Sequence, residues 1–182
     1  FISSGISLVV FPVLLAAGAL LLCDRLIGTS FFVPGGLLFA DEVIQHKGGS
    51  PVLWQHLFWF FGHPAVYIAM LPGLGIVSQL VCDFARRRPA SYRWVVGAFC
   101  AIAMLGMMVW GHHMFVSGMN PALGITFMVA TMMIALPSAV KTFNWLGTVW
   151  GGRIHYTAAM LFALSFVAMF IIGGLSGIFM AA

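Results

Sequence analysis

Three histidines lie within long apolar stretches of this 182-residue sequence: His63 in FFGHPAVY, and the adjacent pair His112 and His113 in WGHHMF. An imidazole is costly to bury in hydrocarbon and usually needs a partner, so three of them in such surroundings indicate a shared ligand. Imidazoles without thiolates or carboxylates favour copper or zinc over calcium or magnesium. The alternative is structural: His63 bonds a backbone carbonyl, and the pair marks a membrane interface.

A tyrosine accompanies the first of these histidines. Tyr67 follows His63 by four residues, so on a helix the two side chains share one face, with the phenol one turn further along. A phenol beside a metal can supply a proton and an electron. The other interpretation is a tyrosine of an interfacial aromatic belt, although Tyr67 lies well inside its apolar segment rather than at the end.

Lys141, in IALPSAVKTFNW, is the only charged residue deep inside an apolar segment. An ionisable group in that setting is a candidate functional residue. Ser138 lies nearly one turn earlier, closer to the expected depth of Tyr67. Lys141, Ser138 and Tyr67 could therefore form polar steps from the inner surface toward the metal. The competing interpretation is that the long lysine stem carries its ammonium group out to the interface.

Composition indicates the surroundings of these residues. The sequence is 62% hydrophobic and 7% charged, with a mean hydropathy of +1.08, and its apolar runs are long enough to cross about 30 Å of hydrocarbon as helices. We therefore expect an all-α, polytopic transmembrane bundle formed by residues 1–182 as a single unit. The five expected spans lie near residues 3–22, 52–82, 92–110, 121–148 and 156–178, and an outer loop covers residues 23–50.

Basic residues gather in two loops that would lie on the same side of such a bundle. The loops before the third and fifth spans hold Arg86, Arg87, Arg88, Arg93 and Arg153. This asymmetry marks the cytoplasmic or matrix face and explains the formal charge of +4 without a nucleic-acid partner. The resulting helix directions bring His63, His112 and His113 to a similar depth, provided that the third helix loosens near Gly111.

The other histidines and the cysteines have simpler interpretations. We expect His46 in solvent on the outer loop, and His56 and His155 near the membrane interfaces. The cysteines match neither a disulfide framework nor a metal-ligand spacing, and we interpret them as structural: Cys23, Cys82 and Cys100. Because the sequence begins at Phe1, with neither Met nor a basic leader, we expect a start in mid-sequence.

Long, ordered motifs in this sequence resemble subunit I of the haem-copper oxygen reductases, the family that includes cytochrome c oxidase. The motifs are QHLFWFFGHPAVYIAMLPGLGIVS, VWGHHMFVSGMN, TMMIALPSAVKTFNWLGT and GGLSG, and the resemblance covers most of the chain. It implies that the five spans correspond to helices five to nine of a twelve-helix subunit. It also implies that the histidines that ligate both haems lie on other helices, outside this chain.

The resemblance gives roles to the residues around the histidines. It implies that His63, His112 and His113 hold the single copper ion of a binuclear centre. It further implies that Tyr67 is covalently joined to His63 and that Trp59 packs beside the copper ligands. Electrons would arrive through a low-spin haem elsewhere in the subunit.

The resemblance also concerns the later spans. It implies proton uptake through Lys141 and Ser138. A high-spin haem would then face Ile134, Ser138, Gly174 and Gly177. The two glycines suit this position because a flat macrocycle needs close approach to the backbone. One departure is Ala65, where the family usually has a glutamate at the end of a second proton channel, so pumping through that branch needs another group or water.

The implied reaction is the four-electron reduction of oxygen to water, coupled to proton translocation. Expected partners are the lipid bilayer, the remaining pieces of subunit I, oxidase subunits II and III, and cytochrome c as electron donor. The expected location is the mitochondrial inner membrane, with the bacterial plasma membrane as the alternative. Two other functions stay open: a quinol oxidase of the same family, and a non-catalytic membrane scaffold or copper-binding remnant.

Overall fold

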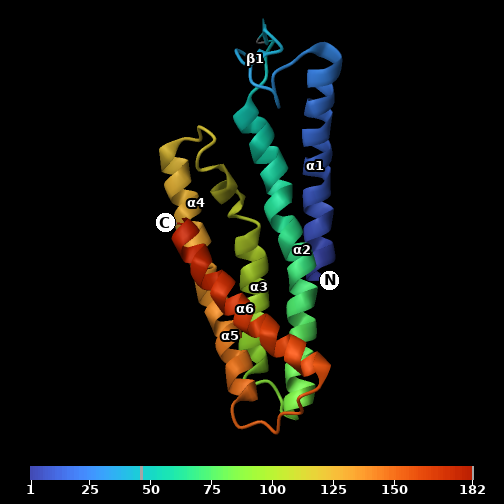
Figure 1. Cartoon of the computed structure of the whole chain (residues 1–182), viewed down its shortest axis with the longest axis vertical. Coiled ribbons are helices and arrows are strands. Elements are labelled where there is room, and N and C mark those ends of the chain that lie inside the picture. The colour runs from blue at the N-terminus through green and yellow to red at the C-terminus, as the bar shows by residue number, and fades with distance from the viewer. Residues whose placement is uncertain (46, 182) are drawn as a thin grey trace.

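Helices account for most of the chain in the computed structural model, which describes residues 1–45 and 47–181 (Figure 1). A 3₁₀ turn, η1, follows the third α-helix, and a short antiparallel hairpin of β1 and β2 lies in the loop after the first. In chain order the elements are α1 (Ile2–Ile27), β1 (Leu38–Phe39), β2 (Glu42–Val43), α2 (Pro51–Ala85), α3 (Tyr92–Gly106), η1 (Trp110–Met114), α4 (Pro121–Met133), α5 (Ala135–Val149) and α6 (Ala158–Ala181). The all-α fold class is therefore confirmed.

Within the described residues, four helical segments are long and apolar enough to cross a membrane: α1, α2, the stretch from α4 through α5, and α6. Helix α3 is also apolar but has only 15 residues. It ends at Gly106 rather than at residue 110, and the chain then passes into η1. The loosening expected near Gly111 therefore begins earlier, and His112 and His113 lie on a 3₁₀ turn rather than on a regular helix.

The stretch of α4 and α5 is interrupted at Ile134. Pro137 lies four residues after Met133, the last residue of α4, and a proline ring clashes with the carbonyl of residue i−4. The Ile134 N–H instead bonds the Thr131 carbonyl at 3.1 Å, a tighter closure of the 3₁₀ type. The interruption matters because Thr131 and Ile134 both lie beside the histidines.

Two of the spanning helices begin at a proline that follows a capping side chain. The Ser50 hydroxyl accepts the Leu53 N–H at 3.3 Å before α2. The Asn120 side chain accepts the Ala122 N–H at 2.9 Å before α4. Proline suits the first helical position because its missing N–H would have no intrahelical partner there. Both starts lie at the outer end of the bundle (Figure 1).

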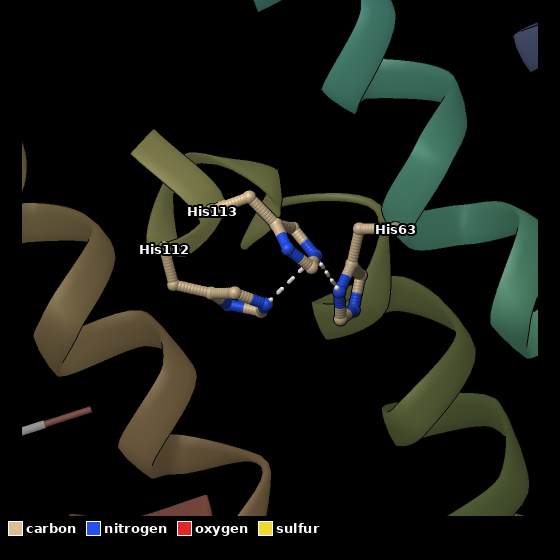
Figure 2. A group of neighbouring side chains, drawn as sticks. All are labelled: His63, His112 and His113. Carbon is tan, nitrogen blue, oxygen red and sulfur yellow. Dashed lines mark hydrogen bonds between the residues drawn. The ribbon is translucent and has the colours of Figure 1, made fainter. Parts of the chain in front are cut away.

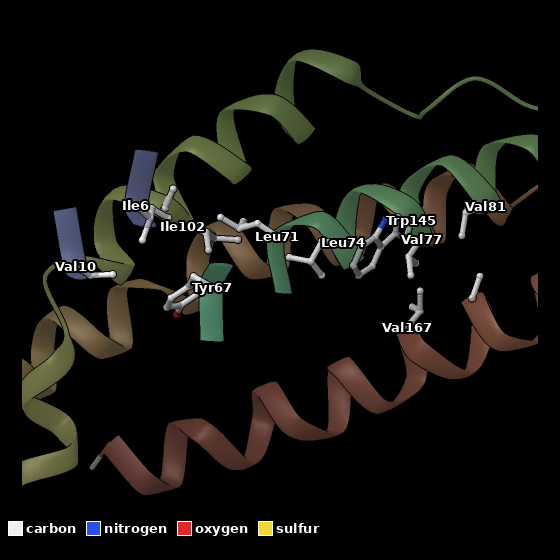
Figure 3. Packing of buried hydrophobic residues seen from close by; sticks show 12 residues of the cluster. Ile6, Val10, Tyr67, Leu71, Leu74, Val77, Val81, Ile102, Trp145 and Val167 are labelled. Atoms are coloured by element: carbon white, nitrogen blue, oxygen red, sulfur yellow. The ribbon is translucent and has the colours of Figure 1, made fainter. Parts of the chain in front are cut away.

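The core surrounds the middle of α2, which packs against α1, α3, α5 and α6. One face of α2 carries Tyr67, Leu71 and Leu74, and side chains from these four helices pack on it (Figure 3). The partners are Ile6 and Val10 of α1, Ile102 of α3, Trp145 of α5 and Val167 of α6. The Trp145 indole N–H also donates to the Ser78 hydroxyl at 2.9 Å, which ties α5 to α2 within the apolar core.

The two basic loops lie together at the end of the bundle opposite the hairpin (Figure 1). The Arg153 N–H donates to the Ala85 carbonyl at 3.1 Å, and the Arg87 guanidinium donates to the Trp150 carbonyl. The arginines therefore share one face, as the charge pattern predicts. His155 is exposed beside them, and its N–H donates to the Phe84 carbonyl at 2.8 Å.

At the other end, Asp24 organises the beginning of the outer loop. Its carboxylate accepts the Thr29 hydroxyl at 2.6 Å and the N–H groups of Phe31 and Phe32 at 2.8 and 2.6 Å. Helix α1 ends just after it, with Gly28 in the left-handed conformation at φ 72°. His46 lies outside the described residues, so its expected exposure stays a prediction.

Candidate metal centre

The side chains of the three histidines converge between α2 and η1 (Figure 2). His63 Nδ1 lies 3.3 Å from His113 Nε2, and His112 Nε2 lies 3.1 Å from the same atom. One nitrogen from each ring lies within 4.8 Å of the others. Residues 50 positions apart in the sequence thus present three ring nitrogens to one point, as the sequence predicts for a shared ligand.

These distances suit a single small cation. A metal–imidazole bond is about 2.0 Å long, so two ligand nitrogens 3.1 or 3.3 Å apart would subtend an angle of about 100–110° at the ion. Hydrogen bonds alone could not link the three rings in this way, because a single N–H on His113 can point at only one of the two neighbouring nitrogens. One cation can bond the three lone pairs at once. A donor set of three imidazoles fits copper or zinc.

Thr131 of α4 fixes the protonation of His112. The Thr131 hydroxyl donates to the Phe127 carbonyl at 2.7 Å, and His112 Nδ1 lies 3.0 Å from the same hydroxyl oxygen. A hydroxyl has one proton to donate, so His112 must donate its Nδ1–H to Thr131. The lone pair of His112 is then on Nε2, the atom that faces His113. A second bond that orients a ligating imidazole in this way is typical of metal sites.

His63 Nε2 is a buried polar atom without a hydrogen-bond partner among the described residues. When Nδ1 faces the other histidines, neutral His63 carries its proton on Nε2, and an unpaired buried N–H costs about 1–3 kcal/mol. Tyr67 lies beside it, with the two ring centroids 4.7 Å apart. Tyr67 is 6% exposed, so the phenol is enclosed next to the unpaired nitrogen.

Glycine makes room for two aromatic rings at this site. A Cβ on Gly106 would lie 2.7 Å from Cε2 of Tyr67, and a Cβ on Gly62 would lie 2.7 Å from Cε3 of Trp59. Trp59 stacks on the His113 ring, with centroids 4.1 Å apart and planes inclined by 7°. Trp59 therefore packs against one of the three histidines.

A cavity of about 170 Å³ adjoins the histidines. It lies between η1, α2, α4, α5 and α6 and brings together seven residues that the sequence singled out. They are His63, Tyr67, His112, Ile134, Ser138, Gly174 and Gly177. A Cβ on either glycine would meet no atom within 4 Å, so the α6 backbone faces open space there, which a flat ring could fill.

A second cavity, of about 260 Å³, continues along α5 and α6. The two cavities share Ser138, Phe170 and Gly174 in their walls. Together they form an apolar space beside the histidine site that is far larger than a metal ion requires. The residues present therefore fit both a metal held by imidazoles and a planar apolar cofactor next to it.

Lys141 does not line either cavity. Its side chain is completely buried, and its Nζ has no hydrogen-bond partner among the described residues. The ammonium group lies 4.1 Å from the ring centroid of Phe170, 5.2 Å from that of Trp145 and 5.8 Å from that of Phe99. It therefore does not extend to the inner interface. The structure brings Ser138 and Tyr67 to one cavity and holds Lys141 outside it.

Sequence reasoning missed three residues around the histidines. Thr131 is a hydroxyl residue inside an apolar helix. Its isolated polar side chain was the signal that could have identified it as part of the site. Gly106 has no sequence signal, because its role depends on a ring from another helix. The sequence placed His56 near an interface but did not indicate that it accepts a hydrogen bond from the Trp110 indole, at 3.2 Å.

Comparisons with known proteins agree with this geometry. The family model described as Cytochrome C and Quinol oxidase polypeptide I matches residues 1–182. The chain is 49% identical over 180 residues to the alternative cytochrome c oxidase subunit 1 of Bradyrhizobium diazoefficiens, covering 99% of this chain and 30% of that protein. It is 47% identical over 182 residues to cytochrome c oxidase subunit 1 of Bacillus subtilis, covering 100% of this chain and 28% of that protein.

A third relative is similar to nearly the same degree. Cytochrome c oxidase polypeptide 1 of Halobacterium salinarum is 45% identical over 178 residues, which are 98% of this chain and 28% of that protein. The chain thus spans less than a third of the length of these relatives. Because the family model matches all of residues 1–182 of this chain, the chain belongs to the cytochrome c and quinol oxidase polypeptide I family.

Proposed function

We propose that this chain forms the copper-binding portion of subunit I of a terminal respiratory oxidase, which reduces oxygen to water. The observation that carries the proposal is the convergence of three ring nitrogens, from His63, His112 and His113, beside a buried tyrosine and an apolar cavity. Family membership supports the same class of enzyme. The whole enzyme's reaction depends on the remainder of a subunit more than three times as long in the relatives.

Copper would be held by His63 Nδ1, His112 Nε2 and His113 Nε2, the three atoms that converge. The bound ion would supply one-electron chemistry and a binding position for oxygen. The protein's part is to fix the ligands: Thr131 sets the tautomer of His112, and Trp59 holds the plane of His113 by stacking. These contacts keep the three lone pairs directed at one point in the absence of any charged ligand.

Tyr67 is proposed to be the local proton and electron donor and to be covalently joined to His63. The unpaired His63 Nε2 and the adjacent phenol ring support this bond. Joining Nε2 to a ring carbon of Tyr67 removes one hydrogen from each partner, and the two electrons and two protons pass to oxygen, the enzyme's own substrate. The bond would also remove the cost of the unpaired buried N–H. A peptide containing both residues would then weigh two hydrogens less than its sequence predicts.

The cavity beside the histidines is proposed to hold a high-spin haem. Ile134, Ser138, Gly174 and Gly177 line it, and the bare α6 backbone at the two glycines would allow close contact with a flat ring. The axial ligand of this haem, and the low-spin haem that delivers electrons, would belong to parts of the subunit outside this chain. The residues of this chain supply the apolar wall that keeps bulk water away from the reacting oxygen.

Protons are proposed to reach the site through Lys141, Ser138 and Tyr67. Ser138 and Tyr67 line one cavity, which supports the last part of this route. The first part requires the Lys141 side chain to leave its aromatic surroundings, because its Nζ has no polar contact among the described residues. Proton translocation through a second branch would need a group other than Ala65, which has no ionisable side chain.

The proposed partners are the remaining parts of subunit I, oxidase subunits II and III, and cytochrome c. A quinol donor is the alternative within the family, whose name covers both kinds of oxidase. The similar proteins from Bradyrhizobium, Bacillus and Halobacterium favour a prokaryotic plasma membrane. They give no support to the mitochondrial inner membrane that the sequence led us to expect.

A visible spectrum with metal analysis of the purified complex tests the proposed function. The proposal predicts haem together with one copper that disappears when His113 is replaced by alanine. The second candidate, a non-catalytic scaffold or copper-binding remnant, is motivated by Ala65, which stands where the family usually has an acid. Copper without haem would favour that candidate and defeat the oxidase.

A further inference from the structure

The turn that carries His112 and His113 begins at Trp110, and the indole of Trp110 is held on three sides. Its Nε1–H donates to His56 Nδ1 of α2 at 3.2 Å. Its ring meets the Phe60 ring of α2 edge-on, with centroids 5.0 Å apart, and the Phe127 ring of α4 at the same separation. Of these contacts only the one with His56 is a directional polar bond.

The donor and acceptor roles in this bond are unambiguous. An indole nitrogen can only donate, so His56 Nδ1 must carry a lone pair and His56 must be neutral, with its proton on Nε2. His56 is half-buried in the outer part of α2. It is therefore used here as a hydrogen-bond acceptor and not as a metal ligand.

The position of this bond along α2 matters for the metal site. His56 and His63 are seven residues apart and lie on the same face of the helix, separated by about 10 Å along its axis. Trp110 contacts the first and His113 contacts the second. Helix α2 therefore holds η1 at two points. A shift of the turn along α2, or a rotation about its own axis, would therefore have to break the polar bond at His56 as well as move the ligands away from His63.

We propose that His56 is a positioning residue for the copper ligands: by accepting the Trp110 N–H, it fixes the place of η1 on α2 and so keeps His112 and His113 directed at His63. The inference rests on the proposed copper site. Since η1 is a short 3₁₀ turn between two non-helical segments, it has weak internal hydrogen bonding of its own. Its position must come from contacts with the neighbouring helices.

The test measures how fast copper leaves the purified, complete oxidase in the presence of a chelator, by metal analysis over time. His56→Phe removes the acceptor and keeps a ring, and Trp110→Phe removes the donor. Each change should accelerate copper loss about 10-fold, as other outer contacts of metal ligands do when removed. The double variant should lose copper no faster than the Trp110→Phe variant alone, because that change already breaks the bond that His56→Phe removes.

Two further variants separate positioning from general destabilisation. His56→Asn presents Oδ1 where the imidazole presented Nδ1, so it should restore retention to within about threefold of the original rate. Trp54→Phe is the matched control, because the Trp54 indole of α2 also donates a hydrogen bond, but to the Ala17 carbonyl of α1, at 3.0 Å. It should leave copper loss unchanged. If His56→Phe fails to assemble, the comparison of Trp110→Phe with Trp54→Phe gives the same information.

The outcomes distinguish this inference from the function on which it rests. Copper that leaves the His56→Phe and Trp110→Phe enzymes at the original rate overturns the positioning role and leaves the copper site intact. Effects of the two changes that multiply in the double variant also overturn it, because they would be independent. An unaltered oxidase with no copper at His63, His112 and His113 overturns the proposed function itself.

Discussion

His112 donates its Nδ1–H to the Thr131 hydroxyl across the gap between η1 and α4, at 3.0 Å. The direction of this bond follows from the hydroxyl's other bond, to the Phe127 carbonyl. It leaves the His112 lone pair on Nε2, facing the other two histidines. A residue of α4 thus decides which nitrogen of an η1 residue is available to a metal.

Replacing Thr131 with valine should weaken copper binding. Valine has the shape of threonine but no hydroxyl, so His112 Nδ1–H would lose its acceptor and the imidazole could change tautomer. We expect an affinity lower by about 10-fold to 100-fold, measured by competition with a copper chelator. Thr126→Val is the control, since the Thr126 hydroxyl bonds the Ala122 carbonyl on an exposed face of the same helix. Equal affinities in both variants would remove Thr131 from the account.

Replacing Gly106 with alanine should displace the tyrosine. The new Cβ would lie 2.7 Å from Cε2 of Tyr67, and the buried ring is enclosed by its neighbours. Overpacking of this kind costs about 1–3 kcal/mol, so we expect a lower apparent Tm and loss of oxygen reduction. The mass of the peptide containing His63 and Tyr67 should also return to its unlinked value.

Gly97→Ala provides the comparison on the same helix, since no atom lies within 4 Å of its Cβ position. That change should be neutral or raise the apparent Tm, because alanine stabilises a helix by up to about 1 kcal/mol relative to glycine. Should both alanine variants behave alike, contact with Tyr67 would not be the reason for Gly106.

Replacing Lys141 with methionine should slow reduction of the high-spin haem while leaving copper content intact. Methionine fills a similar volume, and the Lys141 ammonium makes no hydrogen bond to the described residues that its removal would break. We expect turnover to fall at least about 10-fold if this side chain transfers protons. Lys47→Met, on the exposed outer loop, should have no effect. Normal turnover after the Lys141 change would exclude Lys141 from the mechanism.

Residue type and apolar context were sufficient to predict the central cluster. Three histidines in hydrocarbon-like segments have few stable arrangements, so their convergence follows from the cost of burying each imidazole without a partner. The arginines of the two inner loops indicate the direction of each helix, and with it the common depth of His63 and the pair. These inferences depend only on local residue types and on the apolar segments and loop charges that indicate a membrane. Both can be read from the sequence.

Contacts between distant elements could not be predicted in the same way. Lys141 was expected to form polar steps with Ser138, yet it faces Phe99 of α3 and Phe170 of α6. Which side of α5 meets those helices depends on how the helices pack against one another. The bond between His112 and Thr131 likewise joins two elements, η1 and α4, whose relative position depends on packing. Sequence periodicity contains no information about such packing.

The most direct test is anomalous diffraction at the copper absorption edge from crystals of the assembled oxidase. The account predicts one peak between the three rings, at about 2.0 Å from His63 Nδ1, His112 Nε2 and His113 Nε2. The absence of a peak there, or a copper bound by only one of these histidines with the other rings turned away, would contradict it.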